Sequence, residues 1–266
     1  MNAKSKTFRR KDSGVPRAAE IRLISLPGLP EVREGDDLAL LITQAAARTK
    51  IQFQQNDILV LAQKIVSKSE GRVVQLSSMK ASPKAKLLAA KLNKDPRFVE
   101  IILQQSRRVV RSEHVLIVET HHGFVCANAG VDRSNVPGRD SVALLPMNPD
   151  GSAKKLSDVL SMRAGKHIAV IISDTFGRAW RLGLTNVAIG AAGLPVLIDL
   201  RGTRDRQRKV LHGTILALAD ELAAAAGMLM GKSSGTPVVL IRGYKFRSTK
   251  DSAARIIRSA EEDLFR

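Results

Sequence analysis

Cysteine and aromatic residues are scarce in this sequence of 266 residues. It contains one cysteine, Cys126, and Phe, Trp and Tyr together make up 3% of it. A single cysteine forms neither an internal disulfide nor a thiolate metal cluster, so the composition favours a reducing compartment, and we expect a cytoplasmic protein. The small number of aromatic side chains argues against the base-stacking surfaces by which proteins read single strands and RNA.

Long apolar runs are also absent. No stretch approaches the roughly eighteen consecutive apolar residues of a membrane span, although 44% of the chain is hydrophobic. Residues 1–20 are rich in Lys and Arg but lack the apolar core of a secretory signal. The sequence therefore predicts a globular protein without a membrane segment. We expect residues 1–20 to form a basic flexible tail and residues 21–266 to form one domain, with a possible division near residues 110–150.

Acidic residues are too few to balance the basic ones. The chain has 43 Lys and Arg against 25 Asp and Glu, which gives a net charge of +18. A surplus of this size indicates an anionic partner. No zinc-finger or RNP-type spacing is present, so charge alone leaves nucleic-acid binding open as one alternative function.

Apolar runs and capping residues outline the secondary structure. Ser82-Pro83 and Asp95-Pro96 each place a capping side chain before a proline at the start of a helix. We predict strands at residues 21–26, 58–62, 115–118, 168–172, 187–191, 195–198 and 238–241, and helices at residues 35–49, 83–93, 96–111, 152–163 and 211–230. Because helices and strands are mixed without strict alternation, the expected class is a mixed α/β (α+β) fold.

Three polar clusters follow predicted strands or turns, where α/β proteins commonly carry their sites. They are residues 63–68, 128–135 and 173–178. Asp132, Asp174 and the Thr175 hydroxyl are hard oxygen ligands, which commonly hold Mg²⁺ or Mn²⁺ beside nucleotide phosphates. Lys68 and Arg178 are candidates to neutralise phosphate charge. Either aspartate alone is more often a cap or turn former, but together these residues predict a metal site that handles phosphate.

Five ordered segments carry a family resemblance. They are residues 28–38, 62–72, 126–135, 173–181 and 219–222. In this order they closely resemble the coenzyme F420-0:L-glutamate ligases, the γ-glutamyl ligases of deazaflavin coenzyme biosynthesis. The likeness covers about residues 21–246 and leaves the basic tail outside.

The resemblance implies an activity and an architecture. It implies a GTP-dependent ligase that uses Mg²⁺ or Mn²⁺, with K⁺ as a further candidate ion, and joins L-glutamate to the lactyl carboxylate of F420-0 through an acyl phosphate. Further γ-linked glutamates would follow. The fold would be an unusual two-lobed mixed α/β fold, assembled as an intertwined homodimer. All three substrates are anionic, which accounts for a basic protein without nucleic acid. An amide ligase of the same scaffold acting on another carboxylate stays open as an alternative.

The resemblance also assigns roles to residues of this chain. Asp132, Asp174 and Thr175 match metal ligands, which agrees with the interpretation from the residues themselves. Lys68 would assist phosphoryl transfer through its charge. The residues matching nucleotide contacts are Leu29, Pro30, Glu31, Val32, Gln63, Lys68, Asn135, Met230, Gly231, Lys232, Ser233, Ser234 and Gly235.

Lys232 departs from the family pattern, which usually has Gln or Glu after the Met-Gly pair, with a side-chain oxygen that helps to hold metal. An ammonium has no acceptor and repels a divalent cation. Lys232 must therefore either turn away or replace one metal by contacting phosphate directly, and we favour the second.

Overall fold

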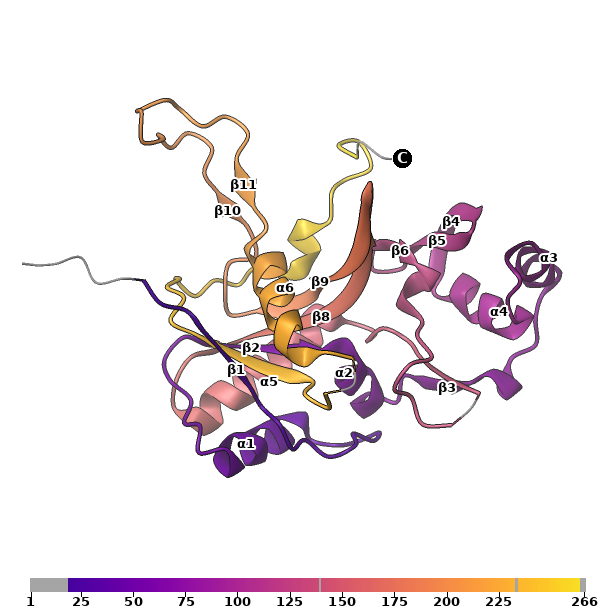
Figure 1. Ribbon diagram of the computed structural model, residues 1–266, viewed down its shortest axis with the longest axis horizontal. Helices are drawn as coiled ribbons and strands as arrows, with labels where there is room; N and C mark the ends of the chain where they lie inside the picture. The colour runs from indigo at the N-terminus through magenta and orange to yellow at the C-terminus, as the bar shows by residue number, and fades with distance from the viewer. Residues whose placement is uncertain (1–18, 139, 233, 264–266) are drawn as a thin grey trace, which may run out of the picture.

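A five-stranded sheet lies at the centre of the computed structural model, which describes residues 19–138, 140–232 and 234–263 (Figure 1). In spatial order its strands are β1 (Arg22–Ser25), β12 (Val238–Arg242), β2 (Asp57–Ala62), β8 (Ile168–Arg178) and β9 (Arg181–Ala192). Strands β2 and β8 are parallel, and the other neighbours are antiparallel. The two parallel strands are covered on both faces, which explains why their sequences are continuous apolar runs.

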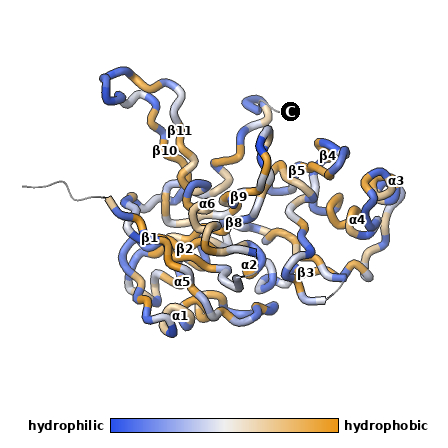
Figure 2. The backbone as a smooth tube through the Cα atoms, in the orientation of Figure 1, coloured by the Kyte–Doolittle hydropathy of each residue, from blue (hydrophilic) through white to orange (hydrophobic). Residues whose placement is uncertain are grey.

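Helices cover both faces of this sheet. Helices α1 (Leu38–Arg48) and α5 (Pro149–Ala164) pack on one face, where Ile42 and Leu160 meet side chains of β2 and β8. Helix α6 (Leu218–Met230) packs on the other face. Figure 1 shows the three layers, and Figure 2 shows hydrophobic residues concentrated along the central strands. Successive side chains of a strand point to opposite faces of the sheet, so the same strands contribute to the apolar clusters on both faces.

A third apolar cluster forms beside the sheet from residues 74–144, with Val99, Ile102 and Leu116 in its interior. Its elements are β3 (Val73–Gln75), the 3₁₀ turn Leu76–Ser78, α3 (Pro83–Leu92), α4 (Pro96–Gln104), β4 (Ser106–Glu113), β5 (Val115–Thr120), β6 (Val125–Ala127), the 3₁₀ turn Asn128–Gly130 and β7 (Ser141–Ala143). Strands β4, β5 and β6 form one small sheet, and β3 pairs with β7. Ser82 and Asp95 cap α3 and α4 as predicted.

The remaining elements are short. Helix α2 (Gln63–Ser69) follows β2 directly, and a 3₁₀ turn spans Ala253–Ile256. Strands β10 (Ile198–Asp199) and β11 (Ile215–Leu216) pair at the base of a loop, residues 200–214, that extends away from the sheet in Figure 1. None of the helices in the described part of the chain is long and apolar enough to cross a membrane. Residues 1–18 of the predicted basic tail lie outside the described residues.

The mixed α/β class is confirmed, with several sheets and, among the described residues, six α-helices. Two predicted helices were wrong in extent. Residues 96–111 divide into α4, which ends at Gln104, and strand β4, because the run from Arg107 to Arg111 pairs with β5. Residues 211–230 also do not form one helix. Helix α6 begins at Leu218, where Asp220 and Glu221 occupy its first turn, and the residues before it include β11.

Three predicted strands also differ. The strand predicted at 187–191 lies within β9, which begins at Arg181. The strand at 168–172 continues through its polar residues to Arg178, because β9 pairs with it along that whole length. At residues 195–198 only Ile198 is in a strand. Helix α2 was not predicted. Its seven residues are too few to show a helical period by themselves.

An ion pair fixes the start of β2 against β12. Asp57 is 1% exposed, and its carboxylate accepts two hydrogen bonds from the Arg242 guanidinium, at 2.9 and 2.7 Å. The Gln54 amide donates to the same carboxylate at 2.7 Å. The pair joins two neighbouring strands of the central sheet, so it stabilises the pairing of β2 with β12 at this end.

We expect Asp57→Ala to lower the free energy of unfolding by about 3 kcal/mol, because it leaves the half-buried Arg242 without its counter-charge. Asp199→Ala is the matched control, since Asp199 forms a similar pair with Arg201 in which both side chains are about half exposed. Its removal should cost much less, because solvent screens an exposed pair. Urea denaturation of the three proteins measures both changes, and equal costs would contradict this account of Asp57.

Candidate active site

A cavity of about 500 Å³ opens at the point where the parallel pairing of β2 with β8 ends. The two strands are parallel and in register, with Ala62 opposite Ser173, so the segments that follow them lie side by side. The lining residues are Leu29, Pro30, Glu31, Val32, Ala62, Gln63, Lys64, Ile65, Lys68, Asp132, Asn135, Ser173, Asp174, Thr175, Leu184, Asn186, Gly227, Met230, Gly231, Lys232, Gly235, Thr236 and Pro237.

Helix α2 brings two ammonium groups to the cavity. Lys64 and Lys68 are four residues apart, so they project from the same face of the helix. Gln63 begins the helix and is 2% exposed; its Oε1 accepts a hydrogen bond from Ser67 at 2.7 Å. The Gln63 Nε2 is buried without a hydrogen-bond partner among the described residues. Lys68 is 8% exposed, and its ammonium forms an ion pair with the Glu31 carboxylate.

Asp132 lies opposite Lys64. The Lys64 Nζ is 2.7 Å from the Asp132 carboxylate, which also accepts hydrogen bonds from the backbone amide and the hydroxyl of Ser134, at 2.8 and 2.9 Å. Burial alone would raise the pKa of Asp132, but the hydrogen bonds and the charge of Lys64 hold it below its usual value. Asp132 is therefore ionised at neutral pH.

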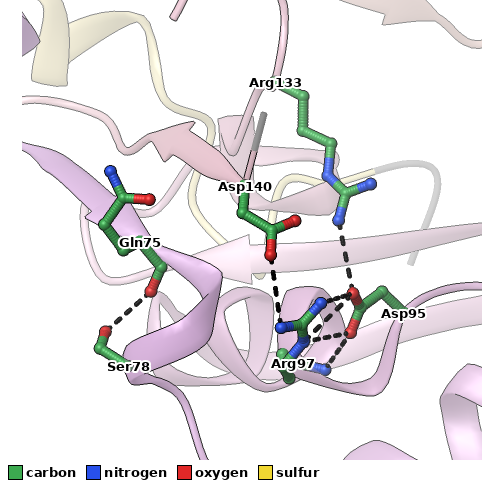
Figure 3. Close-up of polar contacts among 6 residues, drawn as sticks. All are labelled: Gln75, Ser78, Asp95, Arg97, Arg133 and Asp140. Atoms are coloured by element: carbon green, nitrogen blue, oxygen red, sulfur yellow. Dashed lines mark hydrogen bonds and ion pairs between the residues drawn. The ribbon is translucent and has the colours of Figure 1, made fainter. Parts of the chain in front are cut away.

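The loop that carries Asp132 is anchored to the N-terminus of α4 (Figure 3). Arg133, the next residue, approaches the Asp95 carboxylate at 3.8 Å and stacks over the Phe98 ring, 4.9 Å from its centroid. Arg97 binds the same carboxylate at 2.7 Å and reaches Asp140, farther along the loop, at 3.5 Å. Near this network the Ser78 hydroxyl donates to the Gln75 carbonyl. These contacts lie outside the cavity, and they fix the loop that places Asp132 in the cavity wall.

Asp174 is the second carboxylate of the cavity. Burial raises its pKa to about 6, and the nearby charge of Asp132 adds to the rise. Two carboxylates that oppose each other's ionisation favour a cation between them. Asp132 and Asp174 both line the cavity, and in the described part of the chain no group of three or more His, Cys, Asp or Glu side chains gathers to hold a metal. Their oxygens fit one hard divalent cation.

The third predicted metal ligand already has a cationic neighbour. The Lys232 Nζ donates to the Thr175 hydroxyl oxygen at 3.0 Å, and that hydroxyl donates to the Asn186 amide oxygen at 3.3 Å. Helix α6 ends at Met230, and Gly231 (φ 54°) turns the chain toward the cavity. Asn135 then binds the Lys232 carbonyl at 3.0 Å. Lys232 thus points into the site rather than away from it.

The structure brings most of the predicted site residues into one cavity, including all three predicted metal ligands. Arg178, predicted to be catalytic, does not line it. Arg178 lies near the tip of the β8–β9 hairpin, where its guanidinium donates to the Leu182 carbonyl at 2.9 Å. Ser234 also lies off the lining, and its hydroxyl donates to the Met230 carbonyl. Ser233 falls outside the described residues.

Sequence reasoning assigned no role to Lys64 or Asn186. The signal for Lys64 was its spacing of four from Lys68, which becomes informative once residues 63–69 are known to be helical. Asn186 reaches the site only because β9 pairs with β8 in a register that sets it opposite Thr175. No local pattern in the sequence marks that position.

Comparison with known proteins defines the class. Residues 28–243 match the family described as F420-0:Gamma-glutamyl ligase, and the chain belongs to this family. Over 251 residues it is 45% identical to the Coenzyme F420:L-glutamate ligase of Methanothermobacter thermautotrophicus, covering 92% of this chain and 99% of that protein. A protein of the same name from Methanopyrus kandleri is 44% identical over 253 residues, which is 92% of this chain and 98% of the relative.

We expect Asp132→Ala and Asp174→Ala each to weaken Mn²⁺ binding more than about tenfold, because each removes half of the carboxylate pair. The far-UV circular dichroism of both variants should match the wild type, since neither side chain belongs to an apolar cluster. Isothermal titration with Mn²⁺ makes the measurement. Asp158→Ala, on an exposed face of α5, is the control. Wild-type affinity in either cavity variant would remove that residue from the metal site.

Lys232→Gln should increase the number of Mn²⁺ ions bound per chain by one. The substitution replaces an ammonium beside Thr175 with an amide oxygen that can coordinate a metal. Electron paramagnetic resonance of free Mn²⁺ during a titration gives the stoichiometry. Lys155→Gln, at an exposed position of α5, removes the same charge far from the cavity lining and should change nothing. Identical titrations for wild type and Lys232→Gln would show that Lys232 does not occupy a cation position.

Proposed function

We propose that this chain catalyses the GTP-dependent ligation of L-glutamate to the carboxylate of coenzyme F420-0. The observation that carries the proposal is the convergence of Lys64, Lys68 and Lys232 with the Asp132 and Asp174 carboxylates in one cavity. Ammonium groups there match phosphate, and the carboxylate pair matches a divalent cation. The names of the relatives supply coenzyme F420 and L-glutamate as the molecules that are joined.

The proposed reaction has two steps. A carboxylate is a poor acyl donor, so the γ-phosphoryl group of GTP first passes to an oxygen of the acceptor carboxylate, which gives an acyl phosphate and GDP. The amine of glutamate then attacks the acyl carbon. A carbon–nitrogen bond forms, the carbon–oxygen bond to phosphate breaks, the amine loses a proton and inorganic phosphate leaves.

The residues of the cavity supply positive charge where the transferring group becomes negative. Lys68, almost enclosed by protein, has a stronger field at the phosphoryl oxygens than a solvated lysine would have. Lys232, which lies beside Thr175 in the cavity, would contact phosphate directly in the place of one metal ion. Mg²⁺ or Mn²⁺ held by Asp132 and Asp174 would add further charge compensation.

We also propose that the enzyme acts as a homodimer, as the family resemblance implies. The tip of the β8–β9 hairpin supports this assembly, because Trp180 is 88% exposed and Leu182 is 99% exposed. Apolar side chains gathered at one tip favour burial against another surface. Light scattering should give twice the 28.9 kDa of one chain.

The proposed reaction is tested by mass spectrometry of the products formed from GTP, Mn²⁺, L-glutamate and F420-0. We expect the acceptor to gain glutamyl residues, with one GDP and one phosphate released for each. Lys68→Gln should lower kcat by about a hundredfold or more, because the charge acts mainly in the transition state. Lys155→Gln should leave kcat unchanged. Absence of product with wild type, together with tight salt-sensitive binding of nucleic acid, would overturn the proposal.

A further inference from the structure

The two partners of the ion pair between Lys68 and Glu31 differ in their exposure to solvent. The Lys68 side chain is 8% exposed, whereas the Glu31 side chain is 60% exposed. Lys68 is fixed in the last turn of α2, and Glu31 belongs to the irregular segment between β1 and α1. The ammonium is thus built into the wall of the cavity, and the carboxylate reaches it from the solvent side. Of the two partners, Glu31 is the one free to withdraw.

The backbone around Glu31 is held in place. Val32, the next residue, is 3% exposed and packs in the core under α1. The Arg48 guanidinium donates to the Gly28 carbonyl at 2.8 Å, and the Gly35 amide donates to the Ser69 carbonyl at 2.9 Å. Release of Lys68 therefore requires only rotation of the Glu31 side chain about its own bonds, without unfolding of the segment.

The same arrangement recurs one turn earlier on α2. Lys64 is paired with Asp132 as Lys68 is paired with Glu31. Asp132, however, also binds Ser134 and lies on an anchored loop, so it is committed to its position. An anion that enters the cavity and binds Lys68 competes with the Glu31 carboxylate for the ammonium and is repelled by its negative charge.

We propose that Glu31 is a displaceable gate on Lys68, which an entering polyphosphate must move aside. This inference rests on the proposed function, because there the polyphosphate is the triphosphate group of a nucleotide. The gate lowers the apparent affinity for every anion by the fraction of molecules in which Lys68 is free. A polyphosphate has several charges and can contact several cationic groups, so it still binds after this loss of affinity. A small anion such as chloride makes one contact and does not. Glu31 thereby keeps weakly bound small anions out of this subsite, because only a ligand with affinity to spare still occupies it after the loss.

The test uses inorganic tripolyphosphate, which has no base or ribose and so reports on the phosphate subsite alone. Isothermal titration at constant ionic strength compares wild type, Glu31→Gln and Glu34→Gln. We expect Glu31→Gln to bind about threefold to tenfold more tightly, because Lys68 is then free in most molecules. Glu34→Gln removes the same charge from the same exposed segment, away from the cavity lining, and should bind like wild type.

A double-mutant cycle assigns the effect to Lys68. The gain from Glu31→Gln should disappear when Lys68→Met is already present. Equal or weaker binding by Glu31→Gln, equal gains in Glu31→Gln and Glu34→Gln, or a gain that persists without Lys68 would each overturn the gate. Thermal melting of Glu31→Gln should match wild type because the side chain is exposed.

The gate and the proposed function fail in different ways. If wild type forms no glutamylated product while Glu31→Gln still binds tripolyphosphate more tightly, the ligase proposal is wrong and the gate stands. If wild type is an active ligase and Glu31→Gln shows no gain, the gate alone is wrong.

Discussion

The parallel pairing of β2 with β8 is the constraint on which the site depends. Its register sets Ala62 opposite Ser173, and from there one chain turns into α2 while the other runs on through Asp174 and Thr175. A shift of one residue would turn the apolar side chains of either strand to the wrong face, and both faces are buried, so the register is strongly specified. The packing of the core thereby fixes which polar residues meet at the sheet edge.

Charge in the cavity is closely balanced without any ligand. Lys64 and Lys68 are each covered by a carboxylate, and Lys232 lies against Thr175 close enough to stabilise the ionised form of Asp174. The proposed phosphate-bearing ligand and its cation would therefore exchange partners with groups that are already paired. Such exchange costs less than filling a cavity of uncompensated charges, because buried charges are expensive without partners. The chain's large positive surplus lies mostly outside this cavity and does not by itself describe the site.

Much of the fold could be predicted from local signals. The buried strands β2 and β12 are continuous apolar runs, and helices α3 and α4 begin at capping residues, so each of these signals acts over a few positions. Asp132, Asp174 and Thr175 were predicted together from their oxygen chemistry and their position after apolar runs or turns, and all three line the cavity. What could not be predicted depends on tertiary pairing. Residues 173–178 are polar, yet they continue a strand because β9 lies beside them.

In the candidate site, too, local signals could be predicted and tertiary pairing could not. Lys68 lines the cavity as expected, but Arg178, in a neighbouring motif, is carried out along the hairpin to its tip. Asn186 comes to Thr175 only through strand register. Lys232 could be singled out from the sequence, but its direction toward Thr175 depends on the turn at Gly231 and on the bond from Asn135. Residue type and spacing identify candidate chemistry, and packing decides which candidates share a cavity.

Activation of a carboxylate by phosphoryl transfer in this cavity would leave an isotopic signature in the phosphate that is released. F420-0 labelled with ¹⁸O in its reacting carboxylate is converted with unlabelled GTP and L-glutamate, and the released inorganic phosphate is examined by mass spectrometry. An acyl phosphate requires the phosphate to leave with one carboxylate oxygen, so we expect one ¹⁸O atom in each phosphate. Phosphate free of label, formed at the same rate as the amide product, would contradict the account.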